Sequence, residues 1–383
     1  MARISLGSEV DFLDPETLRI SFDIVNNAPR PAEGEAGDHF LIPAAGPHCF
    51  ISRLLLYAGG VLIEDVDFYG RCHEMILSQF TTNEFQLNEG IQAGYILQTA
   101  DRRPDVGLVD PQTKVTTLFR PYLGIINCGK YLPCKLLNLS LEIHFADADT
   151  ALADRHLSGA VSTRDYTIQN LKAHCDVVRL DEALNQSMNK ILLSGRSMIL
   201  AYQTLHNQFQ LIPAGVASHD VSIQRAYSRL NGALLTFGNQ NDHDVIDFRH
   251  PAPLTPGLLP HYSITGSSTL RAQAKVGSLN FPMNPMESIG EMWDALRRMI
   301  GSYDNTLKTM AMYLRDFGAT HFVLAFPFQR VLGKQMTSLN TRSGDLCRFE
   351  LKGMTPDTVH KMWITQIATQ LVSVSADGVT VLD

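Results

Sequence analysis

The sequence is short of charged residues for its length. Asp, Glu, Lys and Arg make up 19% of the 383 residues, against about 25% in an average soluble domain. This deficit favours a protein whose surface is partly buried again in an assembly. The net charge of −7 excludes a chain that binds nucleic acid through overall positive charge. Gly and Pro, with 27 and 18 residues, occur at ordinary levels, which excludes collagen-like and low-complexity chains.

Paired cysteines and long apolar runs are also missing. The six cysteines show no CxxC spacing, so they do not form a disulfide framework. We expect reduced, mostly buried thiols at Cys49, Cys72, Cys128, Cys134, Cys175 and Cys347. The N-terminus lacks the apolar core of a signal peptide. The longest uncharged stretch, 197–219, contains amide side chains and a proline, so we expect no transmembrane helix.

The motifs of nucleotide and cofactor binding are absent or broken. No GxGxxG fingerprint occurs, and there is neither a GxSxG elbow nor the HxH pair of cupin enzymes. Residues 124–130 fit GxxxxGK, but Tyr131 stands where a P-loop needs Ser or Thr to hold Mg²⁺. A P-loop also opens a helix, whereas Pro133 and an alternating strand pattern follow here. We therefore expect a turn between strands and no cofactor.

Catalytic and metal-ligating patterns are incomplete in the same way. His73 and Glu74 begin an HExxH pattern, but Leu77 stands in place of the second histidine ligand. Residues 187–190 match SxxK without its companion motifs. Residues 242–244 read Asp-His-Asp, but lie in a proline-rich stretch with no fixed partner. The sequence therefore predicts no catalytic, cofactor-binding or metal-ligating residue, and a structural or recognition protein rather than an enzyme.

The sequence does contain a strong period of two. Apolar and polar residues alternate over 18–24 and over 137–145, which is typical of strands with one buried face. A weaker alternation covers 171–177, and 322–328 is a continuous apolar run. Residues 363–371 place three large apolar side chains on one face of another extended stretch. The pattern predicts an all-β protein with a few helical insertions.

Turn signals mark three expected hairpins, at Gly59-Gly60, Asn231-Gly232 and Asp377-Gly378. Helices are few, and three are expected over 67–79, 181–194 and 306–317. A fourth is expected over 285–300, because Asn284, Pro285 and Glu287 have the spacing of an N-cap, first and third helical residue. Its Trp293 should be buried as part of a brace across the second domain.

The alternation is lost over 146–164, where the sequence becomes small and polar. We place a domain boundary there, with a first domain over 1–150, a linker over 151–165 and a second domain over 166–383. The second domain contains a Pro-rich insertion over 239–284. A loop of this length usually contacts a partner or lies at the outer surface.

Six stretches together point to a known family through their order and spacing rather than through any one of them: residues 123–141, 168–184, 192–195, 221–237, 339–352 and 374–383. They resemble the major capsid proteins of polinton-like viruses and their relatives.

This resemblance implies a double jelly roll of the adenovirus-type lineage, with two eight-stranded jelly rolls in one chain. In that family three chains form a pseudo-hexagonal capsomer, and capsomers build an icosahedral shell around double-stranded DNA. The implied partners are other copies of the chain, neighbouring capsomers, and penton and minor capsid proteins, without sequence-specific binding of nucleic acid. The implied location is the virion, assembled inside the host cell. The family has no catalytic residues to transfer.

Two other functions remain open on the sequence alone. A carbohydrate-binding jelly roll, such as a lectin or fibre-like attachment protein, needs exposed aromatic platforms, and the chain has only Trp293 and Trp363 as tryptophans. A degenerate cupin-type enzyme would need a histidine cluster that the sequence does not show. Both are less favoured than a shell protein.

Overall fold

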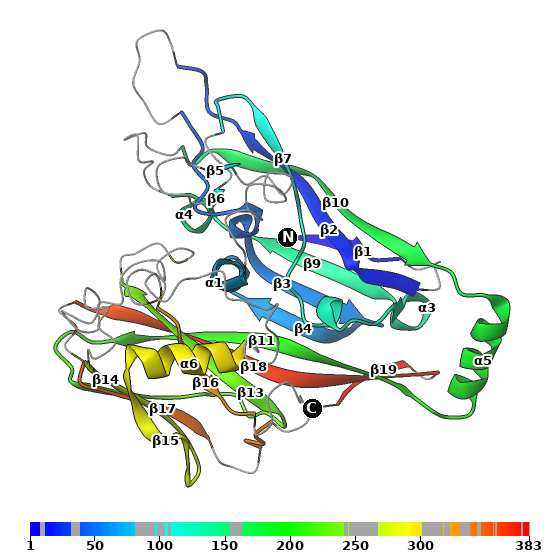
Figure 1. Cartoon of the computed structure of the whole chain (residues 1–383). Helices are drawn as coiled ribbons and strands as arrows, with labels where there is room; N and C mark the ends of the chain where they lie inside the picture. The colour runs from blue at the N-terminus through cyan, green and yellow to red at the C-terminus, as the bar shows by residue number, and fades with distance from the viewer. Residues whose placement is uncertain are drawn as a thin grey trace. The chain divides into compact units, whose positions relative to one another are not determined.

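The structure is a computed structural model of the chain (Figure 1). It describes residues 1–7, 12–31, 39–80, 96–97, 104–105, 109–153, 163–240, 244, 267–300, 317, 322–329, 338–342, 346–354, 356, 358–376 and 378–382. The chain divides into two compact units. The first comprises Met1–Glu74, Thr82–Thr204 and Gln370–Leu382, and the second comprises Met75–Thr81 and Leu205–Thr369.

The first unit contains two antiparallel sheets. One has the order β1 (Ala2–Ser5), β9 (Leu139–Phe145), β3 (Ile51–Ala58), β4 (Val61–Asp67). The other has the order β10 (Tyr166–Val178), β2 (Phe12–Asn26), β7 (Lys114–Phe119), with β8 (Leu132–Pro133) also on β2. Short strands β5 (Ile96–Leu97) and β6 (Pro104–Asp105) pair with each other. The helical elements between the strands are η1 (Pro47–Phe50), α1 (Tyr69–Phe80), η2 (Ile125–Asn127), α3 (Cys134–Leu137), α4 (Ala148–Ala151) and α5 (Glu182–Leu193). The part of α1 from Met75 onward belongs to the second unit.

Two further antiparallel sheets account for the second half of the chain. One has the order β11 (Met198–Ile212), β18 (His360–Ser375), β13 (Leu230–Asn239), β16 (Leu324–Pro327), with β19 (Gly378–Leu382) on β18. The other has the order β12 (Ser218–Ser222), β17 (Cys347–Lys352), β14 (Ser267–Val276), β15 (Leu279–Ser288). Helix α6 (Ile289–Met299) packs against β16. The first residues of β11 and the last of β18 belong to the first unit.

Phenylalanine rings join the two sheets in each unit. In the first unit the fully buried Phe22 of β2 contacts Phe50, Phe119 and Phe145 edge-on, with ring centroids 6.1–6.5 Å apart. In the second unit Phe326 of β16 lies 5.1 Å from Phe349 of β17, and both are fully buried. In each unit, strands of both sheets therefore turn apolar side chains into a core between the sheets, which confirms the predicted all-β class.

Most of the strongest local signals are confirmed. Gly59 and Gly60 take φ values of +58° and +84° in the turn between β3 and β4, as a type I′ turn requires. Strands β18 and β19 form the expected C-terminal hairpin, but Ser375 pairs with Gly378, so the two-residue loop begins one residue earlier than predicted. Helices α1 and α5 form where expected. The helix predicted over 306–317 lies outside the described residues, apart from Phe317.

The hairpin predicted at Asn231-Gly232 is wrong. Strand β13 begins at Leu230 and includes both residues, with a register shift between Leu230 and Gly232, and it pairs with β16 and β18. A Cβ on Gly232 would lie 2.7 Å from the Met299 Cε atom and 2.7 Å from the Phe326 carbonyl oxygen. The glycine is therefore needed for close packing against α6 and β16. The Asn231 amide nitrogen donates to Thr369 Oγ1 at 2.9 Å, so the asparagine serves a buried hydrogen bond rather than a turn.

The predicted start of the helix at Pro285 is also wrong, because 285–288 continue β15. Ser288 is the true N-cap, and its hydroxyl accepts from the Glu291 N–H while the Glu291 carboxylate accepts from the Ser288 N–H. This reciprocal capping box fixes the start more strongly than the proline spacing. The buried face of α6 consists of Met292, Ala295 and Leu296, whereas the predicted brace residue Trp293 is only half-buried, on Phe317.

Two predicted ranges differ from the structure. The expected insertion over 239–284 is not one loop, since 267–276 and 279–288 form the paired strands β14 and β15. Residues 241–243 and 245–266 lie outside the described residues. Strand β10, expected in the second domain, belongs to the first unit, because it pairs with β2 from Tyr166 to Val178.

We predict that Gly232→Ala destabilises the protein by about 1–3 kcal/mol, since the added methyl group must displace backbone as well as a methionine. The measurement is the midpoint of urea unfolding. Gly290→Ala is the matched control, because Gly290 is exposed on α6 with only the Ser288 hydroxyl within 4.0 Å. It should leave stability unchanged or raise it slightly. Equal effects of the two substitutions would contradict the packing role of Gly232.

Candidate assembly surface

The first unit carries an arm, which we define as the end of β10, helix α5 and the start of β11 (Figure 1). Asp181 caps the helix, with its carboxylate accepting from the Ala183 N–H at 2.7 Å. Gly195, at φ +79°, ends it, and its N–H donates to the Leu192 carbonyl. The caps define the helix although few of its side chains pack against the rest of the chain.

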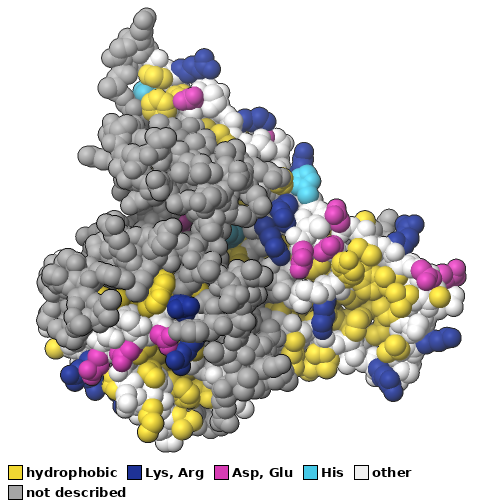
Figure 2. All heavy atoms as spheres, viewed as in Figure 1, with side chains coloured by type: hydrophobic (Ala, Val, Ile, Leu, Met, Phe, Trp, Pro, Cys, Tyr) yellow, Lys and Arg dark blue, Asp and Glu magenta, His cyan; other side chains and the backbone are white. Residues whose placement is uncertain are grey.

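Five of the arm's large apolar side chains are exposed. Leu192 is the only buried residue of α5. Leu184 is 54% exposed, Ile191 50% and Leu193 80%, and Val177 and Ile199 on the flanking strands are 54% and 50% exposed. Figure 2 shows hydrophobic side chains gathered on this side of the visible face. Apolar area of this extent on a chain poor in charge is typical of a protein contact.

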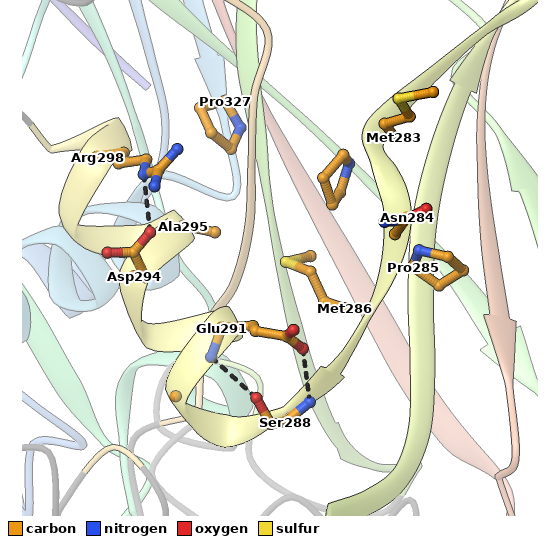
Figure 3. Close-up of a pocket in the computed structure, with 12 residues that line it drawn as sticks. Met283, Asn284, Pro285, Met286, Ser288, Glu291, Asp294, Ala295, Arg298 and Pro327 are labelled. Atoms are coloured by element: carbon orange, nitrogen blue, oxygen red, sulfur yellow. Dashed lines mark hydrogen bonds and ion pairs between the residues drawn. The ribbon is translucent and has the colours of Figure 1, made fainter.

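The second unit has a groove of about 770 Å³ between β15 and α6 (Figure 3). Met283, Pro285 and Met286 line one side of it. On the helix side Asp294 pairs with Arg298 at 2.7 Å, and Glu291 is held in the capping box. Both carboxylates thus already have partners, and the groove offers an apolar wall and one ion pair rather than a catalytic arrangement.

The GxxxxGK stretch is a structural turn, as expected. The Glu64 carboxylate on β4 accepts the backbone N–H of Gly124 at 2.6 Å and of Ile125 at 3.2 Å. These amides would bind phosphate in a P-loop. Burial raises the pKa of Glu64 to about 7, although the two amide hydrogen bonds act to lower it. A Cβ on Gly124 would lie 1.7 Å from the Gln203 carbonyl oxygen, so only glycine fits there.

The partial HExxH pattern lies inside the first unit. His73 and Glu74 are 8% and 2% exposed on α1, and Glu74 bonds to His48 of η1. The sequence could not indicate His48, since it lies 25 residues away from His73 with no motif of its own. Among the described residues no three His, Cys, Asp or Glu side chains gather as a metal site.

The remaining singled-out residues are scattered. Ser187 and Lys190 are exposed on α5. Asp242 and His243 lie outside the described residues, and Asp244 pairs with Lys361. All six cysteines are free, four of them buried and Cys128 and Cys175 half-buried. No helix in the described ranges has the length and apolar character needed to cross a membrane.

No family model matches the chain, and no curated protein matches it. Solved structures do match, over the whole chain. The chain has the double jelly-roll fold found in viral major capsid proteins.

Three matches illustrate the likeness. The PBCV-1 protein VP54, fitted into a reconstruction of the virophage Sputnik, gives a TM-score of 0.64 at 10% identity, covering 100% of this chain and 92% of that chain. The Faustovirus major capsid protein gives 0.58 at 9% identity, covering 97% and 87%. A chain of the Sputnik virophage structure gives 0.55 at 9% identity, covering 99% and 85%. Identities this low establish the fold alone.

One buried carboxylate fixes the strand that leads to the arm. Asp23 of β2 is 4% exposed and accepts from Lys114 Nζ at 2.7 Å, Thr116 Oγ1 at 2.6 Å and Asn170 Nδ2 at 2.7 Å. It thereby ties β7 and β10 to β2, at a bulge where Asn170 has φ +54°. The hydrogen bond from Lys114, followed by those from Thr116 and Asn170, holds the pKa of Asp23 well below its usual range.

We predict that Asp23→Asn lowers stability at pH 7 by about 1–3 kcal/mol, since it removes hydrogen bonds to a charged group. The depressed pKa means that this stabilisation is present above the unfolded value near 4 and is lost as the pH falls below it. Urea unfolding at pH 7 and pH 3 should therefore show a gap between variant and parent that narrows in acid. Asp176→Asn, at an exposed carboxylate on β10, is the control. A gap of equal size at both pH values would contradict the assignment.

Proposed function

We propose that this chain is a major capsid protein, a structural shell component and not an enzyme. Three copies form a pseudo-hexagonal capsomer, and capsomers tile an icosahedral shell around a double-stranded DNA genome. Its partners are further copies of itself and penton and minor capsid proteins. It resides in the virion, after assembly inside the host cell.

The observation that supports this most is the extent of the fold match. Solved capsid structures cover 97–100% of the chain, so two jelly rolls account for nearly all of it. Two similar lobes per chain allow three chains to occupy a position with six neighbours. A closed ring of this kind repeats one heterologous interface three times. The low charge of 19% fits a chain with large buried side surfaces.

The arm supplies a surface for such contacts. Its side chains Leu184, Ile191 and Leu193 are exposed. Covering them with a partner would stabilise the complex by about 25 cal/mol per Å² of apolar area removed from water. A second copy of the chain is the occupant that a self-assembling shell protein provides. We therefore assign the arm to contacts between copies.

The carbohydrate-binding alternative gains no support from the tryptophans. Trp363 is 3% exposed in β18 and packs on Phe209, with ring centroids 5.2 Å apart. Trp293 is half-buried and packs on Phe317 at 5.0 Å. Neither offers the open aromatic face on which a sugar ring stacks.

We predict a trimer in solution. Native mass spectrometry of the purified chain should give three times 42.5 kDa, and the species should persist on dilution because obligate interfaces typically bury more than about 2,000 Å². A well-behaved monomer across the same concentrations would contradict the capsomer proposal.

We predict that Leu184→Asp combined with Ile191→Asp prevents assembly without unfolding the chain, since both side chains are at least half exposed in the single chain. The circular dichroism spectrum should stay unchanged while light scattering shows loss of trimers or of larger assemblies. Asn189→Asp, which adds charge at an exposed polar position of the same helix, should have no effect. Normal assembly of the double variant would show that the arm does not contribute to the contacts between copies.

A further inference from the structure

A connected polar cluster lies inside the first unit, away from the arm. The imidazole rings of His48 and His73 stack with centroids 4.4 Å apart and an interplanar angle of 7°. His48 Nε2 lies 2.6 Å from Glu74 Oε2, and the Tyr69 hydroxyl lies 2.9 Å from His73 Nδ1. All four side chains belong to residues that are at most 8% exposed. The cluster joins η1 to the first turns of α1.

The hydrogen bonds define where the proton of His73 lies. The Tyr69 hydroxyl oxygen accepts the backbone N–H of Tyr122 at 2.8 Å. Its own single hydrogen is then available for His73 Nδ1, which we assign as the acceptor. Neutral His73 therefore carries its hydrogen on Nε2, and Nδ1 is the position that a further proton would take.

Three effects oppose that further proton. A hydrogen on His73 Nδ1 would face the hydroxyl hydrogen of Tyr69 and break their bond. The site is buried, so a charged ring loses its hydration. The neighbouring His48, whose Nε2 lies 2.6 Å from Glu74 Oε2, brings positive charge to the stacked face of His73. Burial first, and His48 second, hold the pKa of His73 well below its usual value.

We propose that this cluster is an acid-sensitive latch in the first jelly roll. Uptake of a proton by His73 breaks its hydrogen bond to Tyr69 within α1 and sets a charged ring against the stacked ring of His48, which weakens the contact between η1 and α1. The latch is a property of the single chain. Its use, the loosening of a shell in an acidic compartment, rests on the proposed function.

Other titratable groups surround the cluster. Cys72 and the buried Arg71 lie on α1, Tyr122 follows β7, and Glu64 acts on Tyr69 and Tyr122 from β4. The contribution of Glu64 to stability changes with pH in the opposite direction from that of His73. Its raised pKa of about 7 means that its contribution to stability is gained as the pH falls.

The Glu64 carboxylate is held by the amides of Gly124 and Ile125, not by η1 or α1. An opening that releases His73 can therefore leave Glu64 in place. In global unfolding the two groups offset each other, because the unfolded chain protonates His73 while the folded chain protonates Glu64. The latch is thus expected as a local opening rather than as a loss of overall stability.

The pH dependence of the local opening is set by His73, because His48 carries its proton in the closed form and, below the ordinary histidine pKa, in the open form as well. Below the ordinary histidine pKa of about 6.5, the open form takes up a proton that the closed form excludes. The opening equilibrium constant should rise up to tenfold for each further pH unit.

The test is hydrogen exchange with mass spectrometry on the full chain from pH 7.5 to pH 5.0, corrected for the intrinsic pH dependence of exchange. Peptides covering η1 and the first turns of α1 should open about tenfold more per pH unit below about 6.5, while peptides of β2 and β9 should not. His73→Asn, which keeps an acceptor near the Nδ1 position but does not take a proton, should remove the pH dependence. His174→Asn, at an exposed histidine of β10, should retain it.

Exchange of the η1 and α1 peptides that is independent of pH in the parent chain would overturn the latch. So would an unchanged pH dependence in His73→Asn, or in His73→Gln if the first variant does not fold. Native mass at pH 7.5 separates this result from the proposed function. A monomer that opens in acid would overturn the capsomer proposal and support the latch. A trimer that does not open in acid would support the capsomer proposal and overturn the latch.

Discussion

The packing of two antiparallel sheets against each other, once in each unit, is the constraint on which the rest of this molecule depends. Phe22 anchors it in the first unit and the Phe326–Phe349 pair in the second. Burying the apolar faces of the inner strands stabilises each sandwich, whereas the edge strand β10 has no buried side chain. Close approaches such as that of Gly232 to α6 follow from this packing, because the helix must lie directly on the sheet.

The sandwiches also determine how the few charged side chains of the chain are used. Carboxylates that might have formed a site are used internally: Asp23 ties three strands together, and Glu64 occupies the amides of a loop that resembles a phosphate-binding turn. Five of the large apolar side chains left outside the cores lie on the arm. Fold, internal electrostatics and surface thus favour the same functional class, a protein that associates with copies of itself.

Much of the fold could be predicted from the sequence, because alternation and glycine turns are local signals. The strand around Phe22 and the Gly59-Gly60 turn are examples. Asn231-Gly232 has the sequence of a tight turn, but the glycine is required by close packing against α6 and β16. Asn284–Glu287 has the spacing of a helix start, but the capping box at Ser288 sets the start of the helix. The stack of His48 on His73 could not be predicted, since it joins elements separated in sequence and paired only by the tertiary fold.

The central claim is that three copies of this double jelly roll form one six-lobed capsomer. Cryo-electron microscopy of the purified chain tests it most directly, because class averages display both symmetry and lobe number. Averages with three-fold symmetry and six similar lobes around one axis are the predicted result. Particles with a single pair of lobes, or closed rings of another symmetry, would contradict it.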